Sequence, residues 1–462
     1  MPSVLLIRPL CEGDEPEFAE PLGIERLAGY LRAYGVGDVR VCDRRLYQAE
    51  WRSGIADEFT GGLFDDLRKA YPPGRAPALV GLSLMTSADV PDARRIMSRL
   101  GRWWPQATFM AGGVYVTGAP EEAARVLPRG VILQRGEGEA QLLALARATG
   151  ATGAEAPPFV SPDDWAIPHR PYPERYAALG CAVNVQASRG CPGACTFCAT
   201  PLLPKQLRRW QPRDLRLVVD EMQQVAERLA AAGLPPIFNF VDDDFGPLFR
   251  LEGLADELGR RRLRVAFACE MRLVSLIGQP ALAERLARLR EAGLTRVFFG
   301  VESLDPATLE RWKKPYDVSA LPQVLEAFRT AGITVQPGYI LWHAGQTVRG
   351  ARAEVEGLRR LGIYSHRAAL SRLIVFPGCA LAHGSIDATG FQSMDAQAEA
   401  FCRRFSAKTG DLTRMWTQAA IAEPHAVAEA FLTGDGTRLA TLRDALDEAN
   451  ERSFALFMEM SA

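Results

Sequence analysis

Residues 188–198 read SRGCPGACTFC and contain three of the nine cysteines in this 462-residue chain. The three residues, Cys191, Cys195 and Cys198, have the spacing C-x3-C-x2-C. Thiolates are soft ligands that suit zinc or an iron–sulfur cluster. Structural zinc usually has four closed ligands, and no fourth Cys or His lies near this stretch, since the nearest histidine is His169. The spacing therefore favours an iron–sulfur cluster that is held by three thiolates and has one iron open to another ligand.

The segments around this loop alternate between short apolar strands and amphipathic helices. In the second half of the chain, helices are predicted at 214–232, 251–262, 280–292, 319–331 and 348–361. They separate strands that are predicted at 182–187, 237–241, 264–270, 296–301, 334–341 and 370–375. Six strand–helix units in series indicate a barrel or partial barrel, with its chemistry at the C-terminal ends of the strands.

The first half of the chain has the same alternation, with strands predicted at 4–8, 39–42, 79–83, 108–111 and 131–134. This pattern indicates a parallel sheet with helices on both faces and a ligand site at the carboxyl ends of its strands. Six prolines between residues 157 and 173 then interrupt the alternation and indicate a linker. The fold class is therefore α/β, with a Rossmann-like domain at 1–148, a linker at 149–178, a barrel at 179–380 and a helical region at 381–462.

Composition limits the classes of function. Lys and Arg number 54 against 55 Asp and Glu, and this balance does not favour extended contact with nucleic acid. No apolar run is long enough for a membrane helix, and residues 1–8 do not resemble an export signal, so we expect a cytoplasmic protein with reduced thiols. The remaining cysteines form no second close group, so we expect only one cluster; they are Cys11, Cys42, Cys181, Cys269, Cys379 and Cys402.

The cysteine motif, placed after the first barrel strand, resembles that of the radical S-adenosylmethionine (SAM) superfamily. The resemblance implies that Cys191, Cys195 and Cys198 bind a 4Fe–4S cluster. It implies contacts of SAM with further residues at the strand ends. The adenine would be contacted by Phe197, Gly338 and Ile340, and the ribose by Glu302 and Ser303. The methionine amino group would be contacted by Asp242, Asp243 and Asp244, and its carboxylate by Arg272 of a Glu270-x-Arg272 motif. Val375 is expected in the SAM site as well.

The resemblance also implies a mechanism. An electron from the cluster, supplied by a low-potential donor such as flavodoxin or ferredoxin, would cleave SAM to a 5′-deoxyadenosyl radical. That radical would take a hydrogen atom from a small polar substrate. Near the substrate we expect Cys379, which follows a Phe-Pro-Gly turn, and His343 as candidate catalytic residues, with Tyr339, Trp342 and His366 alongside. A metal-binding module without enzyme activity is an alternative to any enzyme, and the run of barrel motifs disfavours this alternative.

The first domain resembles the flavodoxin-type cobalamin-binding domain that precedes many radical SAM barrels. Matching segments lie at 21–28, 83–86, 112–117 and 135–139, but the Asp-x-His-x-x-Gly segment is absent. Cobalamin binding therefore stays open, and with it two reactions. One is cobalamin-dependent C-methylation. The other, which we favour slightly, is the radical 1,2-diol dehydration of an aminoglycoside in antibiotic biosynthesis of the apramycin type. An amino-sugar substrate would suit the acidic loop formed by Glu12, Asp14, Glu15, Glu17 and Glu20.

Overall fold

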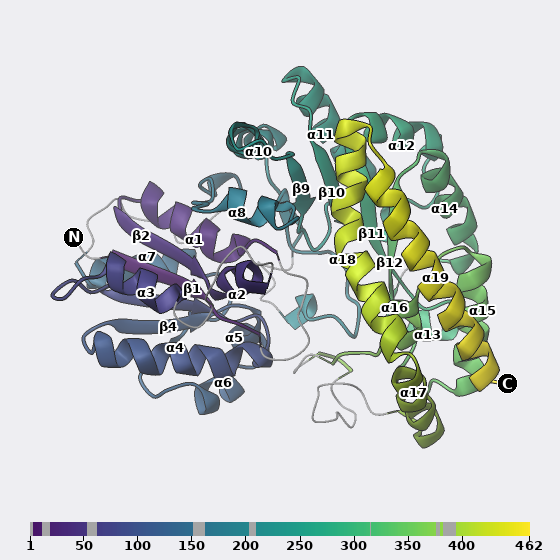
Figure 1. Cartoon of the computed structure of the whole chain (residues 1–462), viewed down its shortest axis with the longest axis horizontal. Coiled ribbons are helices and arrows are strands. Elements are labelled where there is room, and N and C mark those ends of the chain that lie inside the picture. The colour runs from purple at the N-terminus through teal and green to yellow at the C-terminus, as the bar shows by residue number, and fades with distance from the viewer. Residues whose placement is uncertain are drawn as a thin grey trace. The chain divides into compact units, whose positions relative to one another are not determined.

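Apolar strands form two separate sheets, one in each half of the chain (Figure 1). The computed structural model describes residues 3–11, 19–52, 62–150, 162–202, 209–314, 316–375, 379–381 and 394–462. The chain divides into two compact units, Met1–Asn184 and Val185–Ala462, each of which is described by itself.

The sheet of the first unit has five parallel strands in the order β2-β1-β3-β4-β5. The strands are β1 (Ser3–Arg8), β2 (Asp38–Asp43), β3 (Leu79–Ser83), β4 (Thr108–Gly112) and β5 (Ile132–Leu133). This is the flavodoxin-like order, in which the chain reverses its direction of growth between β1 and β3. The predicted Rossmann-like sheet is confirmed, and the carboxyl ends of β1 and β3 lie at its switch point.

Helices cover both faces of this sheet because alternate residues of each strand face opposite sides. Val4 and Leu6 pack with α1 (Leu22–Ala33) and α7 (Glu139–Ala148). Leu5 and Ile7 pack with the helices of the other face. These are α3 (Gly62–Ala70), α4 (Val90–Trp103), α5 (Val114–Gly118) and α6 (Pro120–Val126), while α2 (Arg44–Arg52) follows β2.

Residues 162–184, most of which were predicted as linker, pack within the first unit. They include η2 (Pro162–Asp164) and α8 (Pro173–Ala178). Trp165 is buried and lies 3.9 Å from the guanidinium carbon of Arg26 on α1. The Arg170 guanidinium is buried too, and it pairs with Glu20 and donates to the Asn184 carbonyl over 2.7 Å. The domain boundaries expected from the sequence stay predictions.

The second unit contains a sheet with the order β12-β11-β10-β9-β6. Its strands are β6 (Val183–Val185), β9 (Ile237–Phe240), β10 (Ala266–Met271), β11 (Leu294–Glu302) and β12 (Thr334–Tyr339). The connecting helices are α10 (Leu215–Ala231), α11 (Leu248–Arg260), α12 (Leu282–Glu291), α13 (Pro306–Arg311), α14 (Leu321–Thr330) and α15 (Val348–Arg360). A short antiparallel ribbon of β7 (Ser188–Arg189) and β8 (Gln211–Pro212) follows β6.

The sixth strand, predicted at 370–375, is reduced to isolated bridges. Helix α16 (His366–Leu370) occupies the residues before it, and the Ser365 side chain caps that helix. Arg372 forms a parallel bridge to Trp342, Ile374 is a bridge residue as well, and Leu373 donates its N–H to the Trp342 carbonyl over 2.8 Å. The α/β fold with a partial barrel is confirmed, and its last strand is much shorter than the sequence suggested.

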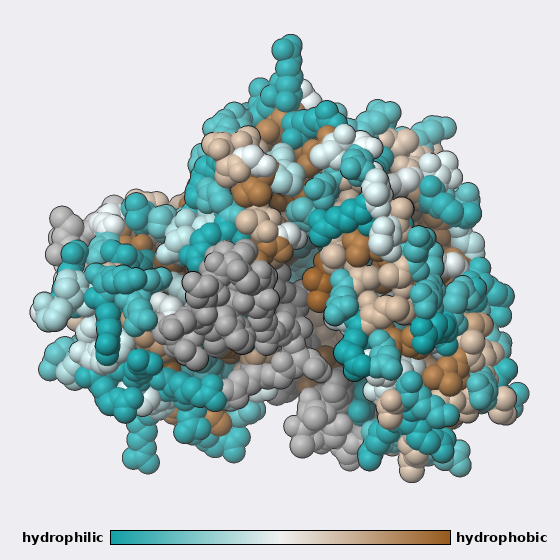
Figure 2. Space-filling model, viewed as in Figure 1, coloured by the Kyte–Doolittle hydropathy of each residue, from teal (hydrophilic) through white to brown (hydrophobic). Residues whose placement is uncertain are grey.

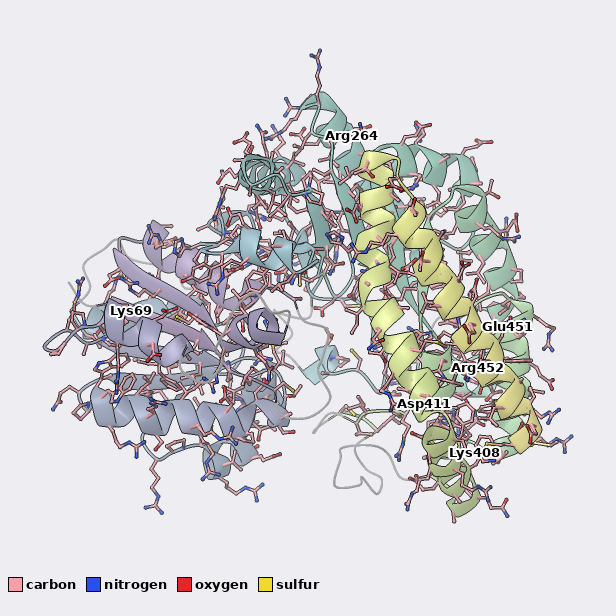
Figure 3. The ribbon with its side chains drawn as sticks, viewed as in Figure 1. Lys69, Arg264, Lys408, Asp411, Glu451 and Arg452 are labelled. Atoms are coloured by element: carbon pink, nitrogen blue, oxygen red, sulfur yellow. The ribbon has the colours of Figure 1, made fainter. Side chains whose placement is uncertain are left out.

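The predicted helical C-terminal region is confirmed by α17 (Ala396–Lys408), α18 (Gly410–Thr433) and α19 (Thr437–Met460). Figure 1 shows α18 and α19 side by side over the second sheet, where α18 contacts β10 and β11. Their outward side chains are largely hydrophilic, with apolar patches between them (Figure 2). Glu451 of α19, labelled in Figure 3, pairs with Arg359 of α15 over 2.5 Å. Within the described residues, no helix has the length and apolarity to cross a bilayer.

Candidate active site

The cysteine loop leaves the β6 end of the second sheet. Cys191, Cys195 and Cys198 are free thiols and are partly exposed. Backbone N–H groups point at two of the sulfurs, from Gly193 to Cys191 Sγ and from Thr200 to Cys198 Sγ, each over 3.4 Å. Such donors stabilise negative charge on sulfur, which is a requirement for cluster ligands.

The chemistry of this loop fits a cluster. A Cβ atom added to Gly193 would lie 3.3 Å from Cys191 Sγ, 3.8 Å from Cys195 Sγ and 3.8 Å from Arg272 Nε. Burial raises the pKa of the Cys191 thiol to about 11, although the Gly193 N–H and Arg272 both act to lower that pKa. Bound iron would replace the thiol proton. No three His, Cys, Asp or Glu side chains of the described residues converge on a single-ion site. Thiolates of a 4Fe–4S cluster bind separate irons and need no such convergence.

The acidic segment after β9 divides into structural and accessible side chains. Asp242 is buried and accepts bonds from the Ala187 N–H over 3.0 Å and the Ser188 hydroxyl over 2.6 Å. Asp244 is buried too, and accepts from the N–H groups of Gly246 and Arg272 over 3.1 and 3.3 Å. Asp243 is exposed. Asp242 and Asp244 thus shape the loop, and the contact with an amino group that was predicted for this segment stays a prediction.

At the end of β10, the backbone holds Glu270 and Arg272 beside the acidic segment. The Glu270 carbonyl accepts from the Phe245 N–H over 2.9 Å. Arg272 is half-buried, and its Nε lies beside Gly193, between the thiol loop and Asp244. A guanidinium in this place can bind a carboxylate through two parallel hydrogen bonds. This agrees with the expected role of Arg272, which stays a prediction.

The end of β11 has an unusual backbone. Glu302 has a φ of +68°, in the left-handed region that residues with a side chain rarely adopt. Its carboxylate folds back over Gly300, where a Cβ would collide with Glu302 Oε1, and pairs with Lys314 Nζ at 3.2 Å. The Ser303 hydroxyl is buried and donates to Glu354 Oε2 over 2.8 Å. Ser303 is thus committed to Glu354, and the ribose contact predicted for Glu302 stays a prediction.

An apolar cluster gathers most of the side chains expected around adenine. Val375 and Cys379 are buried in it with Trp312 and Leu373, and Phe197, Ile340 and Leu381 pack against them. Gly338 packs elsewhere, on β12, where a Cβ would be 2.7 Å from the Phe298 ring. Sequence reasoning missed Trp312 and Lys314, because the turn after α13 carries no motif. Residues 376–378 and 382–393 lie outside the described part of the chain.

His343 lies behind this cluster, with its ring centroid 4.9 Å from that of Trp312. Its Nδ1 is 2.9 Å from the Ala344 carbonyl oxygen, and burial lowers its pKa. Its buried Nε2 has no hydrogen-bond partner among the described residues.

Three other side chains that we expected beside the substrate are used elsewhere. Tyr339 donates to Glu354, and Trp342 packs on Phe401 under the C-terminal helices. His366 is buried between Ser453 and Thr413, 2.8 Å from each hydroxyl oxygen. The expectation for Trp342 and His366 was wrong because the C-terminal helices cover them.

In the first unit, the strand ends pair their charges with one another. Arg8, at the end of β1, pairs with the buried Asp89 at 2.7 Å. Asp89 also accepts from the N–H groups of Met85 and Thr86 over 2.5 and 3.1 Å, which shapes the loop after β3. Met85 on this loop and Val114 after β4 keep 45% and 44% of their surfaces exposed.

Of the five acids in the predicted acidic loop, Glu20 is the one within the described residues. Glu20 is buried and pairs with Arg170, so it is neither solvated nor open to a cationic ligand. The other four acids lie outside the described residues.

Residues 185–347 match the Radical SAM superfamily. The chain carries a radical SAM domain. The cofactors of this chemistry are a 4Fe–4S cluster and SAM, and the residues of the cysteine loop fit them.

Several curated relatives are named as methyltransferases. An uncharacterized methyltransferase of Pyrococcus horikoshii is 26% identical over 74% of this chain and 74% of its own length. The hopanoid C-3 methylase of Methylococcus capsulatus is 28% identical over 68% of this chain and 60% of its own. The bacteriochlorophyllide d C-12(1)-methyltransferase of Chlorobaculum tepidum is 30% identical, over 34% of this chain and 32% of its own.

Two solved structures share the fold. The cobalamin-dependent SAM radical enzyme OxsB, solved with aqua-cobalamin and SAM, has a TM-score of 0.71 at 15% identity, over 99% of this chain and 72% of its own. The radical SAM methyltransferase TsrM from Kitasatospora setae, solved with cobalamin and a [4Fe–4S] cluster, has a TM-score of 0.60 at 20% identity, over 82% and 74%. At this identity the likeness shows the architecture of a flavodoxin-type domain followed by a radical SAM domain.

Proposed function

We propose that this radical SAM enzyme is a cobalamin-dependent methyltransferase that acts on a carbon atom of a small molecule. The observation that carries the proposal is the carboxyl edge of the first sheet. Met85 and Val114 lie there on loops that follow two neighbouring strands, and both are exposed. The methylases above, which align with most of this chain, support the same reaction.

The first unit offers cobalamin a surface rather than a cobalt ligand from histidine. Gly113, with a φ of +98°, brings the loop after β4 against the Leu84 backbone, where a Cβ would collide with the carbonyl oxygen. This close approach fixes Met85 and Val114 on adjacent loops, where their side chains can contact the face of a broad ring. No histidine precedes His169 in the sequence, so an imidazole from residues 1–150 does not ligate cobalt.

In the second unit, side chains from several strand ends would hold the cluster and SAM. Cys191, Cys195 and Cys198 would bind iron, Arg272 would bind the methionine carboxylate, and Asp243 its amino group. Glu302 would accept hydrogen bonds from the ribose hydroxyls, and Phe197 and Ile340 would contact the adenine. When bound, these groups supply one-electron chemistry, a hydrogen-abstracting radical and a methyl group. The surrounding apolar cluster excludes water from this chemistry.

The first half-reaction tests this proposal without a known substrate. The chain is purified without oxygen, reconstituted with iron, sulfide and cobalamin, and supplied with SAM and a low-potential reductant such as flavodoxin or ferredoxin. A methyltransferase should bind cobalamin stoichiometrically and form S-adenosylhomocysteine only when cobalamin is present. Formation of 5′-deoxyadenosine alone, with no cobalamin retained, would overturn the proposal.

That second outcome would favour radical dehydration of a diol in an amino sugar, as the sequence suggested. The structure weakens the argument for it, because Glu20 of the acidic loop is committed to Arg170. With an amino-sugar diol as the assay substrate, the two reactions differ by mass, since dehydration removes water and methylation adds a methyl group.

A further inference from the structure

An ammonium group that no sequence motif indicates lies between the thiol loop and the end of β11. Lys314 Nζ is 3.2 Å from Glu302 Oε1, and the two side chains keep only 16% and 13% of their surfaces exposed. The same nitrogen lies 5.9 Å from the ring centroid of Phe197, next to the cluster ligand Cys198 in sequence. Lys314 therefore pairs with Glu302 on the predicted ribose side of the site and lies near Phe197 of the cysteine loop on the cluster side.

The backbone fixes this position. Lys314 donates its N–H to the Leu309 carbonyl over 3.0 Å, which folds the turn after α13 back onto the helix. Two residues later, the Tyr316 hydroxyl donates to the Val301 carbonyl and ties the turn to β11. On the other side, the Ile340 N–H donates to the Glu302 carbonyl over 2.9 Å. The ion pair is thus held from three elements rather than formed by two free side chains.

The charge of Lys314 lies near the cysteine loop. Its ammonium nitrogen is 5.9 Å from the ring centroid of Phe197, a residue that stands between Cys195 and Cys198 in the sequence. A 4Fe–4S cluster gains one negative charge on reduction, and its potential depends on nearby charge. A lysine in a partly buried place, where screening by water is weak, stabilises the reduced form.

We infer that Lys314 is a positioning residue of the SAM site, which holds the Glu302 carboxylate toward the ribose and eases reduction of the cluster by placing a positive charge near the cysteine loop. The inference rests on the radical SAM domain and on the ribose contact proposed for Glu302. It does not depend on methyl transfer. If wild-type protein forms no S-adenosylhomocysteine, methyl transfer is lost but the measurements below are unaffected.

The test uses the full reconstituted chain and two measurements that need no substrate. One is the midpoint potential of the cluster from a redox titration followed by electron paramagnetic resonance, and the other is the dissociation constant of SAM. Lys314→Met should shift the potential to more negative values and weaken SAM binding about tenfold, as expected for the loss of a charge-assisted contact. Lys314→Arg keeps the charge and should keep the potential. The matched control is Lys313→Met, since Lys313 is exposed and adjacent.

Lys314→Met protein with a full iron and sulfide content but an unchanged potential and SAM affinity would overturn the inference. If that variant does not assemble its cluster, Glu302→Gln decides. It leaves the lysine charge in place and removes its counter-charge, so SAM binding should weaken while the potential moves to more positive values. Weaker binding without a change in potential would then reject the electrostatic part, and unchanged binding would reject the positioning part.

Discussion

The carboxyl ends of the two sheets use their charged residues in opposite ways. In the first unit, Arg8 pairs with Asp89 and Arg45 with Asp43, all four largely buried, and the neighbouring loops expose the apolar Met85 and Val114 beside the uncharged Thr86 and Ser87. In the second unit, the half-buried Arg272 and the Glu302–Lys314 pair surround free thiols. Each of the two α/β sheets thus presents different chemistry at its own carboxyl edge. The first suits a broad apolar ring, and the second suits an iron–sulfur cluster and a small zwitterion.

The strongest way to break this comparison is to remove the thiols. Replacement of Cys191, Cys195 and Cys198 by Ala should abolish cluster assembly and all formation of 5′-deoxyadenosine, because no other close group of thiols exists in the sequence to replace them. Iron and sulfide assays and chromatography of the nucleoside products measure both effects. Cys181→Ala, in the first unit, is the matched control and should keep full activity. Retention of the cluster in the triple variant would contradict the assignment.

The next largest effect tests whether the charges of the first sheet are structural. Asp89→Ala should destabilise the first unit by about 3–5 kcal/mol, because it leaves Arg8 as a buried charge without its partner. Hydrogen exchange of the β1 and β3 amides measures the free energy of opening. Arg95→Ala removes an exposed guanidinium 4.0 Å from Asp92, which keeps its closer pair with Arg44, and should cost less than about 1 kcal/mol. Equal costs for the two variants would mean that the buried pair is not structural.

A third prediction separates His366 from the residues of the site. Burial lowers its pKa to about 4, so the imidazole is neutral in the folded chain. The pKa of His366 is lower in the folded chain than its unfolded value of about 6.5. Its contribution to the free energy of unfolding is therefore complete above that pH and falls as the pH drops toward 4. The stability of wild type minus that of His366→Gln, from urea unfolding, should shrink by about 2–3 kcal/mol over this range. A pH-independent difference would contradict this, and 5′-deoxyadenosine formation at pH 8 should survive the change.

Both sheets and the cysteine loop could be predicted from the sequence because each leaves a local signal. Alternating apolar segments predict strands, and thiols at fixed spacing predict ligands. The roles of Asp242 and Ser303 could not be separated from those of Asp243 and Glu302. The difference depends on hydrogen bonds to Ala187 and Glu354, which are distant in sequence.

The predictions of a sixth strand and of a place beside the substrate for His366 failed for a related reason. An apolar segment at 370–375 satisfies the pattern of a strand, but it forms isolated bridges at Arg372 and Ile374 instead of a continuous ladder. The C-terminal helices supply the partners of His366, through Thr413 and Ser453, and nothing near residue 366 announces them. Lys314 was missed because its role depends on a turn that folds back from α13 to the thiol loop.

The smallest effect tests the apolar character of the first edge. Val114→Asp should weaken cobalamin binding about tenfold, because a charged carboxylate would have to lose water against the ring. Met85→Glu on the neighbouring loop should act in the same direction. Absorbance titration with cobalamin measures the dissociation constants, and the cluster content should stay at the wild-type value.

The control for this prediction is Ile167→Asp, which places the same charge at another exposed apolar residue of the first unit, 39% exposed and in the segment that packs near α1. A general loss of stability would weaken cobalamin binding in all three variants. A specific contact weakens it only for the residues that follow β3 and β4. If Val114→Asp and Ile167→Asp bind cobalamin equally well, the apolar side chains do not contact the ring. The contrast between the two edges would then concern the stability of the first unit rather than its ligand.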